Sequence, residues 1–167
     1  MTDRRRILAL GALGATALLA SSRSALAADC PPAGRAEAIG AALLDRYVAA
    51  ANARDTSVFP QLFTETYIQH SGRSPSGLAA QVETFRGIFA RMPDLKLSAE
   101  DRIIGGDKVV ARMAFAATHT QPLQGVAPTG KPFVLRTIDI WRVENGKFAE
   151  HWDLTDAGEV IGKLRAD

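Results

Sequence analysis

The stretch "IDIWRVENGKFAEHWDLTD" (residues 138–156) decides the fold of this 167-residue chain, because it contains a complete β-hairpin. Apolar and polar residues alternate on both sides of Glu144-Asn145-Gly146, which is typical of two strands joined by a tight turn. The second strand carries His151, Trp152 and Asp153 side by side. Neighbouring strand residues point to opposite faces, so His151 and Asp153 share one face and Trp152 occupies the other.

The length of the turn determines which residues of the two strands lie opposite each other. A two-residue turn at Asn145-Gly146 would point Asp139 away from His151. A three-residue loop that includes Glu144 would place Asp139 directly opposite His151, and we expect this register because Glu is unremarkable at the first position of a type I turn. One face would then carry Phe133, Leu135, Thr137, Asp139, Trp141, Ala149, His151 and Asp153, and the other Val134, Ile138, Ile140, Phe148 and Trp152.

Three ionisable side chains, Asp139, His151 and Asp153, are thus predicted to converge on a mostly apolar surface. An unpaired charge beside buried apolar groups is costly, which makes this cluster a candidate functional site. The alternative is an Asp139–His151 pair that only ties two strands together. The opposite, apolar face is expected to be an interface or a packed layer.

The preceding chain reads as helices followed by strands, which is typical of a single α+β domain. Apolar spacing of three to four residues predicts the helices, and Gly105-Gly106-Asp107 predicts a second hairpin. We expect the strands from residue 95 onward to form an antiparallel meander. The predicted helices are 35–52, 58–63 and 77–92, and the predicted strands are 65–70, 95–104, 109–120, 133–143 and 147–154. Two alternatives are open for residues 157–164, a last short helix or an irregular chain end.

The N-terminus has the features of an export signal. Arg4-Arg5-Arg6 precedes an uncharged run, and Ala25-Leu26-Ala27 fits a signal peptidase site. The arginines resemble a twin-arginine signal, so we expect a signal peptide at 1–27, a flexible mature N-terminus at 28–34 and a periplasmic or secreted protein. The alternative is a retained membrane anchor, although the uncharged run of 15 residues (8–22) is short for a membrane span. Cleavage removes four arginines and one aspartate, which changes the net charge from +2 to −1. The mature chain therefore has no basic patch that would indicate nucleic acid, and we expect no membrane association.

The segments "YIQH" (67–70), "THTQPLQGVAPTGK" (118–131) and "IDIWRVENGKFAEHWDLTD" together resemble the SnoaL-like polyketide cyclases of the nuclear transport factor 2-like superfamily. The resemblance covers about residues 36–164, within a domain that we place at 35–164. It implies a cone-shaped, curved antiparallel sheet wrapped on the N-terminal helices, with a deep apolar pocket and a homodimeric assembly. The superfamily also contains non-catalytic modules, so an enzyme and a binding or dimerisation module are both open.

The resemblance also implies a mechanism. Asp153 matches the general acid/base of the family's cyclases, which work without metal or cofactor on an apolar carbonyl compound. An apolar pocket would disfavour the charged carboxylate and so make it a stronger base. His151 or His70 would stabilise or reprotonate the enolate, and a surface histidine without a role in the pocket is the alternative for His70. Trp141 and Phe89 would lie in the pocket wall or in the core. Asp139 departs from the family pattern, because this inward position is more often a neutral or imidazole donor.

Overall fold

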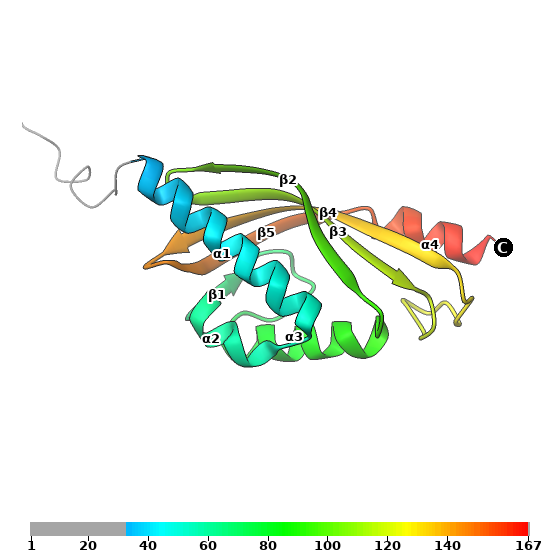
Figure 1. The fold of residues 1–167 in the computed structure, drawn as a ribbon. Coiled ribbons are helices and arrows are strands. Elements are labelled where there is room, and N and C mark those ends of the chain that lie inside the picture. Colours follow the sequence, from blue (N-terminus) through cyan, green and yellow to red (C-terminus); the bar gives the residue numbers. More distant parts are fainter. Residues whose placement is uncertain (1–32, 167) are drawn as a thin grey trace, which may run out of the picture.

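The computed structural model describes residues 33–166 (Figure 1). The predicted signal peptide and residues 28–32 lie outside the described residues. The described chain forms an α+β domain with a curved, unclosed sheet, which confirms the predicted fold class. Its elements are α1 (Ala33–Ala53), the 3₁₀ turn η2 (Thr56–Val58), α2 (Phe59–Leu62), β1 (Phe63–Gln69), α3 (Leu78–Arg91), β2 (Lys96–Gly105), β3 (Lys108–Thr118), β4 (Pro132–Glu144), β5 (Lys147–Thr155) and α4 (Ala157–Arg165).

The five strands lie in the order β1-β5-β4-β3-β2. The four strands from β2 to β5 form the expected antiparallel meander. One edge of the sheet departs from the antiparallel pattern, because β1 pairs with β5 in parallel. In the chain, β1 lies between α2 and α3 and is not joined to β5 by a hairpin. No tight turn therefore constrains the two strands to run in opposite directions.

The β4–β5 register differs from the expected one. The turn is the two-residue Asn145-Gly146, with φ of 51° and 73°, the left-handed values that a type I′ turn needs. A β-bulge follows, in which Ala149 is the extra residue and the register shifts by one. Asp139 therefore lies opposite Asp153, and His151 opposite Trp141, rather than Asp139 opposite His151.

The bulge explains why Asp139, His151 and Asp153 share one face as predicted, although the predicted register is wrong. A two-residue turn alone would have pointed Asp139 away from His151, and the one-residue shift at Ala149 brings the two to the same side. Phe148, which precedes the bulge, is fully buried in the core and does not lie on the outer face as expected. It stacks on Trp141 with ring centroids 5.0 Å apart.

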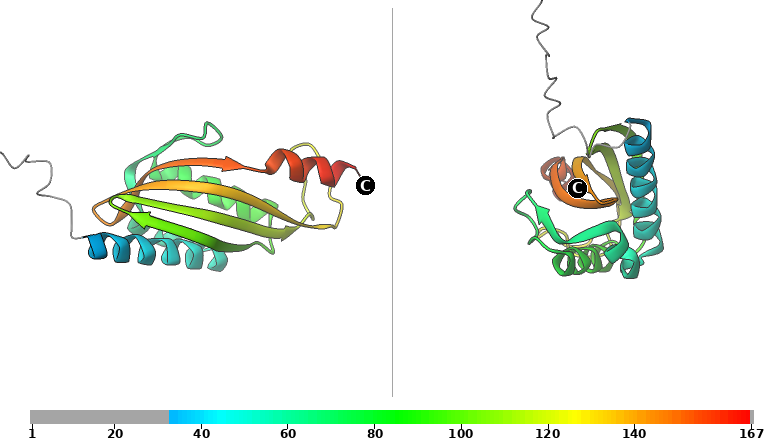
Figure 2. Two further views of the ribbon diagram at one scale, coloured as in Figure 1. Left: turned by 90° about the horizontal axis from the view of Figure 1, so that it is seen from above. Right: turned by 90° about the vertical axis from the view of Figure 1, so that its left-hand side faces the viewer.

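Helices α1 and α3 cover the concave side of the sheet, and β1 and α2 close the same side (Figure 2). α1 approaches the sheet closely at Gly40, where an added Cβ would lie 2.8 Å from Ile104 Cγ2 and 2.9 Å from Val109 Cγ2. The core on this side is strongly aromatic, with Tyr47, Phe59, Phe63, Tyr67, Phe85, Trp141 and Phe148 in one cluster. A second cluster lies at the other end of the sheet, where α4 packs on Phe133 and Val126.

Candidate functional site

A polar cavity of about 130 Å³ lies between the concave face of the sheet and α3. β4 contributes Thr137, Asp139 and Trp141 to its wall, and β5 contributes His151 and Asp153. Alternation along the two strands points these five side chains to the same side of the sheet. The remaining walls come from α1, α3, β3, the end of β1 and the loop after it. The three ionisable groups predicted from the hairpin are therefore brought together in one cavity.

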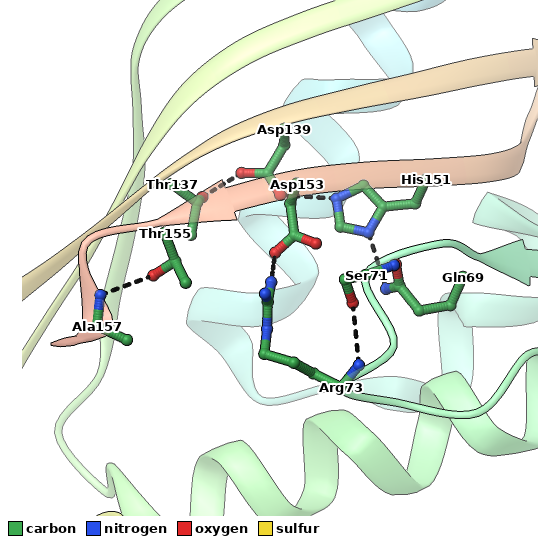
Figure 3. Close-up of polar contacts among 9 residues, drawn as sticks. All are labelled: Gln69, Ser71, Arg73, Thr137, Asp139, His151, Asp153, Thr155 and Ala157. Carbon is green, nitrogen blue, oxygen red and sulfur yellow. Dashed lines mark hydrogen bonds and ion pairs between the residues drawn. The ribbon is translucent and has the colours of Figure 1, made fainter.

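His151 is held from both sides of its ring. Its Nδ1 lies 2.9 Å from Gln69 Nε2, and its Nε2 lies 2.7 Å from Asp139 Oδ1 (Figure 3). The Ser71 N–H donates to Gln69 Oε1 at 3.1 Å, so the NH₂ group of Gln69 faces the imidazole. Gln69 therefore donates to Nδ1, and His151 donates its Nε2–H to Asp139. This arrangement suits a neutral imidazole in a single tautomer, with both nitrogens already engaged.

Asp139 is a buried carboxylate whose side chain is 6% exposed. It accepts hydrogen bonds from His151 and from the Thr137 hydroxyl, so its charge is not left unpaired. Trp141 stacks on the His151 ring with centroids 5.0 Å apart. Burial, and then the charge of Asp139, raises the pKa of Tyr47 well above its usual value. Tyr47 thus stays a neutral phenol in the cavity wall.

Asp153 differs from Asp139 because one of its oxygens is free. Its Oδ2 accepts a hydrogen bond from Arg73 Nη2, within an ion pair between β5 and the loop after β1 (Figure 3). Its Oδ1 is buried and has no hydrogen-bond partner among the described residues. A buried, unpartnered carboxylate oxygen in a cavity wall is costly unless a ligand or solvent satisfies it. Asp153 is thus the carboxylate of this site that is free to accept a proton.

Gln81 supplies a second unengaged polar group. It lies on α3, lines the same cavity and is only 5% exposed. Its side-chain amide makes no hydrogen bond within residues 33–166. An amide in this position can donate to a ligand oxygen on the other side of the cavity from the sheet.

Two residues expected to bind substrate lie outside this cavity. His70 is at the end of β1, where its Nε2 lies 2.9 Å from Glu150 Oε2 and its ring stacks on Trp152 at 4.4 Å. Hydrogen bonds from His70 and Arg142 lower the pKa of Glu150. Phe89 packs against the core beside Phe85 and does not line the cavity. Both side chains are thus engaged in structural contacts.

The residue pattern of the hairpin does not indicate Arg73, Gln69 or Gln81. Arg73 belongs to "HSGRSPSG" (70–77), a loop without periodicity, and its partner Asp153 is 80 residues away. Gln81 lies on the buried face of a predicted helix, and a glutamine among Leu78, Val82 and Phe85 is the signal that could have marked it. Within residues 33–166, no group of three His, Cys, Asp or Glu side chains is placed to hold a metal ion.

Comparison with known proteins adds a family and a set of folds. A family model described as SnoaL-like polyketide cyclase matches residues 41–161. A search of curated protein sequences found no match. The solved structure of TsrD from Streptomyces laurentii is 29% identical with a TM-score of 0.71, over 78% of this chain and 97% of that one. AclR from Streptomyces galilaeus, a candidate hydroxylase, is 27% identical with a TM-score of 0.69, over 78% and 98%. IdmH from Streptomyces antibioticus, a candidate polyketide cyclase, shares the fold at 24% identity and a TM-score of 0.67, over 75% and 97%.

Proposed function

Because this chain belongs to the SnoaL-like polyketide cyclase family, we propose that it is an acid/base enzyme in which Asp153 removes a proton next to a carbonyl group. The observation that carries the proposal is the free Oδ1 of Asp153, buried in the cavity wall. A general base must lie within hydrogen-bond reach of the proton that it removes, and no residue of 33–166 competes for this oxygen. The substrate class is a small apolar carbonyl compound, as the aromatic and aliphatic parts of the wall favour.

The proposed reaction needs no reactant other than the substrate. The C–H bond next to the carbonyl breaks, its proton goes to Asp153 Oδ1, and its electron pair forms an enolate. The enolate carbon then attacks a second carbonyl carbon of the same molecule, a C–C bond forms, and the resulting alkoxide takes the proton back from Asp153. The proposed reaction uses no metal or cofactor, as the family resemblance implies.

Gln81 is the proposed donor to the enolate oxygen. Its amide is buried, unengaged and part of the same cavity as Asp153. A preorganised donor stabilises the charge that develops on the oxygen and needs no reorganisation to do so. His151 has no free N–H for this role, because Gln69 and Asp139 occupy its two nitrogens. We assign to His151 and Asp139 the positioning of the β4–β5 wall.

Proton exchange tests the base directly, without knowledge of the natural substrate. We expect the protein to accelerate the incorporation of deuterium next to the carbonyl of α-tetralone in heavy water, followed by NMR. Asp153→Asn should lower this rate by about 10²–10⁴-fold, the usual contribution of a general base. Asp45→Asn, which removes a carboxylate on the exposed side of α1, is the matched control and should leave the rate unchanged.

The alternative is a non-catalytic module that binds a small apolar ligand in the same cavity. It predicts ligand-induced shifts of cavity resonances but no faster exchange than in the absence of protein. Faster exchange that survives in Asp153→Asn would show that another group is the base.

We further propose that the protein is exported and that two copies associate through the outer face of the sheet. This face carries Ile103 (70% exposed) and Leu154 (77% exposed). Between them, Val110, Ile140 and Trp152 form a row across β3, β4 and β5. Leu154→Glu should convert a dimer into a monomer in analytical ultracentrifugation, whereas a wild-type monomer would refute the association.

Export is supported by the arginines and the Ala25-Leu26-Ala27 site. The N-terminal residue of protein isolated from the producing cell should be Ala28, and an intact Met1 would refute cleavage. Among residues 33–166, no helix has the length and apolar character to cross a membrane.

A further inference from the structure

We infer that the ligand of this site carries an anionic group, such as a carboxylate, which binds Arg73 and Arg91 beside an apolar groove. The inference deepens the proposed function and rests on it in assuming that the cavity holds a ligand. It identifies a substrate class, an apolar acid with an enolisable carbonyl group.

The groove adjoins the polar cavity. It has a volume of about 460 Å³ and shares Arg73, Ile88, Phe115, Thr137 and Asp153 with the cavity. Its other walls are mainly apolar, from Met92, Leu123 and Leu135. Small-molecule sites usually measure ~300–1,000 Å³, so the cavity alone is smaller than a usual site, whereas the groove lies within this range. A ligand that fills a site of usual size and reaches Asp153 would therefore extend past Arg73 into the groove.

The charges of the groove are unbalanced. Arg91, near the end of α3, lines the groove, and its side chain makes no ion pair or hydrogen bond with another described residue. The guanidinium of Arg73 contacts Asp153 through Nη2, and its remaining guanidinium N–H groups make no hydrogen bond to another residue of the described chain. A guanidinium carries five N–H donors in a planar fork, so Arg73 can hold Asp153 and a ligand anion together. Among the described residues, Asp153 is the one carboxylate that lines the groove, and it also lines the cavity.

An anion between the two arginines would orient the substrate. Guanidinium–carboxylate contacts are charge-assisted and can be bidentate, which fixes direction as well as position. With the acid group in the groove and the apolar skeleton along Phe115 and Ile88, the opposite end of the molecule enters the cavity toward Asp153 Oδ1. Such anchoring turns the approach of the carbonyl to its base into an intramolecular event.

Binding of two matched probes tests the inference. β-Naphthoate and β-naphthamide have the same skeleton and differ in charge, and calorimetry at about 50 mM salt limits screening. We expect the wild-type protein to bind naphthoate at least about tenfold more tightly than naphthamide. Arg73→Gln and Arg91→Gln should each reduce this ratio, and the double variant should bring it to about one.

Controls keep the outcomes distinct. Arg86 lies on α3, as Arg91 does, but it pairs with Glu83 and does not line the groove. Arg86→Gln should therefore preserve the ratio of naphthoate to naphthamide affinity. Arg73→Lys should keep part of the preference, which separates loss of charge from loss of folding. Equal affinities in the wild type, a ratio that survives in the double variant, or no binding of either probe would overturn the inference.

Asp153→Asn separates this inference from the proposed function. It frees the Arg73 guanidinium, so naphthoate should bind more tightly, by about threefold or more, while exchange into tetralone is lost. Exchange that continues in Asp153→Asn, with the anion preference intact, would refute the base but leave the anion site standing. Loss of exchange in Asp153→Asn, without a preference for the anion, would refute the anion site but leave Asp153 as the base.

Discussion

Replacement of Asp139 by Asn or by Leu tests how the buried His151–Asp139 contact is held. The two side chains are 9% and 6% exposed, so the contact is nearly dry. Gln69 donates to His151 Nδ1, which leaves the Nε2–H to point at Asp139 Oδ1, 2.7 Å away. If His151 is neutral, an amide oxygen at position 139 accepts this hydrogen as a carboxylate oxygen does.

The Asn variant should therefore be nearly as stable as the wild type. The Thr137 hydroxyl, which now donates to Asp139, can rotate and accept from the new NH₂ group. Loss of a charge-assisted hydrogen bond is offset because an ion no longer has to be buried. We expect a loss of about 1 kcal/mol or less in the free energy of unfolding.

The Leu side chain has the same branched skeleton as Asp, with methyl groups in place of the two oxygens, and therefore has no acceptor. It leaves the His151 N–H and the Thr137 hydroxyl buried without partners, at about 1–3 kcal/mol for each group. We expect a loss of about 4 kcal/mol, or roughly 12–16 °C in Tm for a domain of this size.

Urea denaturation at neutral pH, followed by circular dichroism, measures both variants, and nitrogen NMR of the His151 ring reports its tautomer. If Asp139→Asn loses as much stability as Asp139→Leu, the contact depends on opposite charges. His151 would then be protonated on both nitrogens, and the assignment of its tautomer through Gln69 would be refuted.

Two further stability predictions use the same denaturation series. Gly40→Ala should destabilise by about 1–3 kcal/mol because its Cβ meets side-chain carbons of β2 and β3 at 2.8–2.9 Å. Gly162→Ala, in α4 with nothing within 4 Å, should instead stabilise by about 0.5–1 kcal/mol, and the reverse order would refute the close α1 packing. The pKa of Glu150 is lowered by hydrogen bonds from His70 and Arg142, so its folded pKa lies below its unfolded one. Its stabilisation is therefore present above the unfolded pKa of ~4.3 and lost as the pH falls through the folded pKa. The wild type should be more stable than Glu150→Gln at neutral pH, and a gap that persists at about pH 3 would contradict this assignment.

Local sequence patterns predicted the elements of this domain closely. The helix expected at 77–92 is observed at Leu78–Arg91, and the last strand, expected at 147–154, is Lys147–Thr155. The helical apolar spacing before Pro93 and the glycine-containing turns are each contained within a few residues. Such signals survive folding because neighbouring residues alone determine them.

The register of the β4–β5 hairpin could not be predicted from local patterns. Its pattern placed Asp139, His151 and Asp153 on one face, and the structure does the same. The register behind that prediction was wrong, because the bulge at Ala149 leaves no clear mark in the alternation. A bulge is selected by the packing on both sides of the strand, here the burial of Phe148 as well as Ala149.

The amino-acid sequence by itself determined the elements, the α+β class and the inward alternation of the last two strands, because turns and periodicity act over a few residues. Tertiary structure alone decided the parallel pairing of β1 with β5, the Arg73–Asp153 ion pair and the placement of Gln81 in the cavity wall. These contacts join residues from α3, β5 and the loop after β1, and the Arg73–Asp153 pair spans 80 positions of the chain. They form only when the sheet curves around the helices, and no local sequence pattern specifies that curvature.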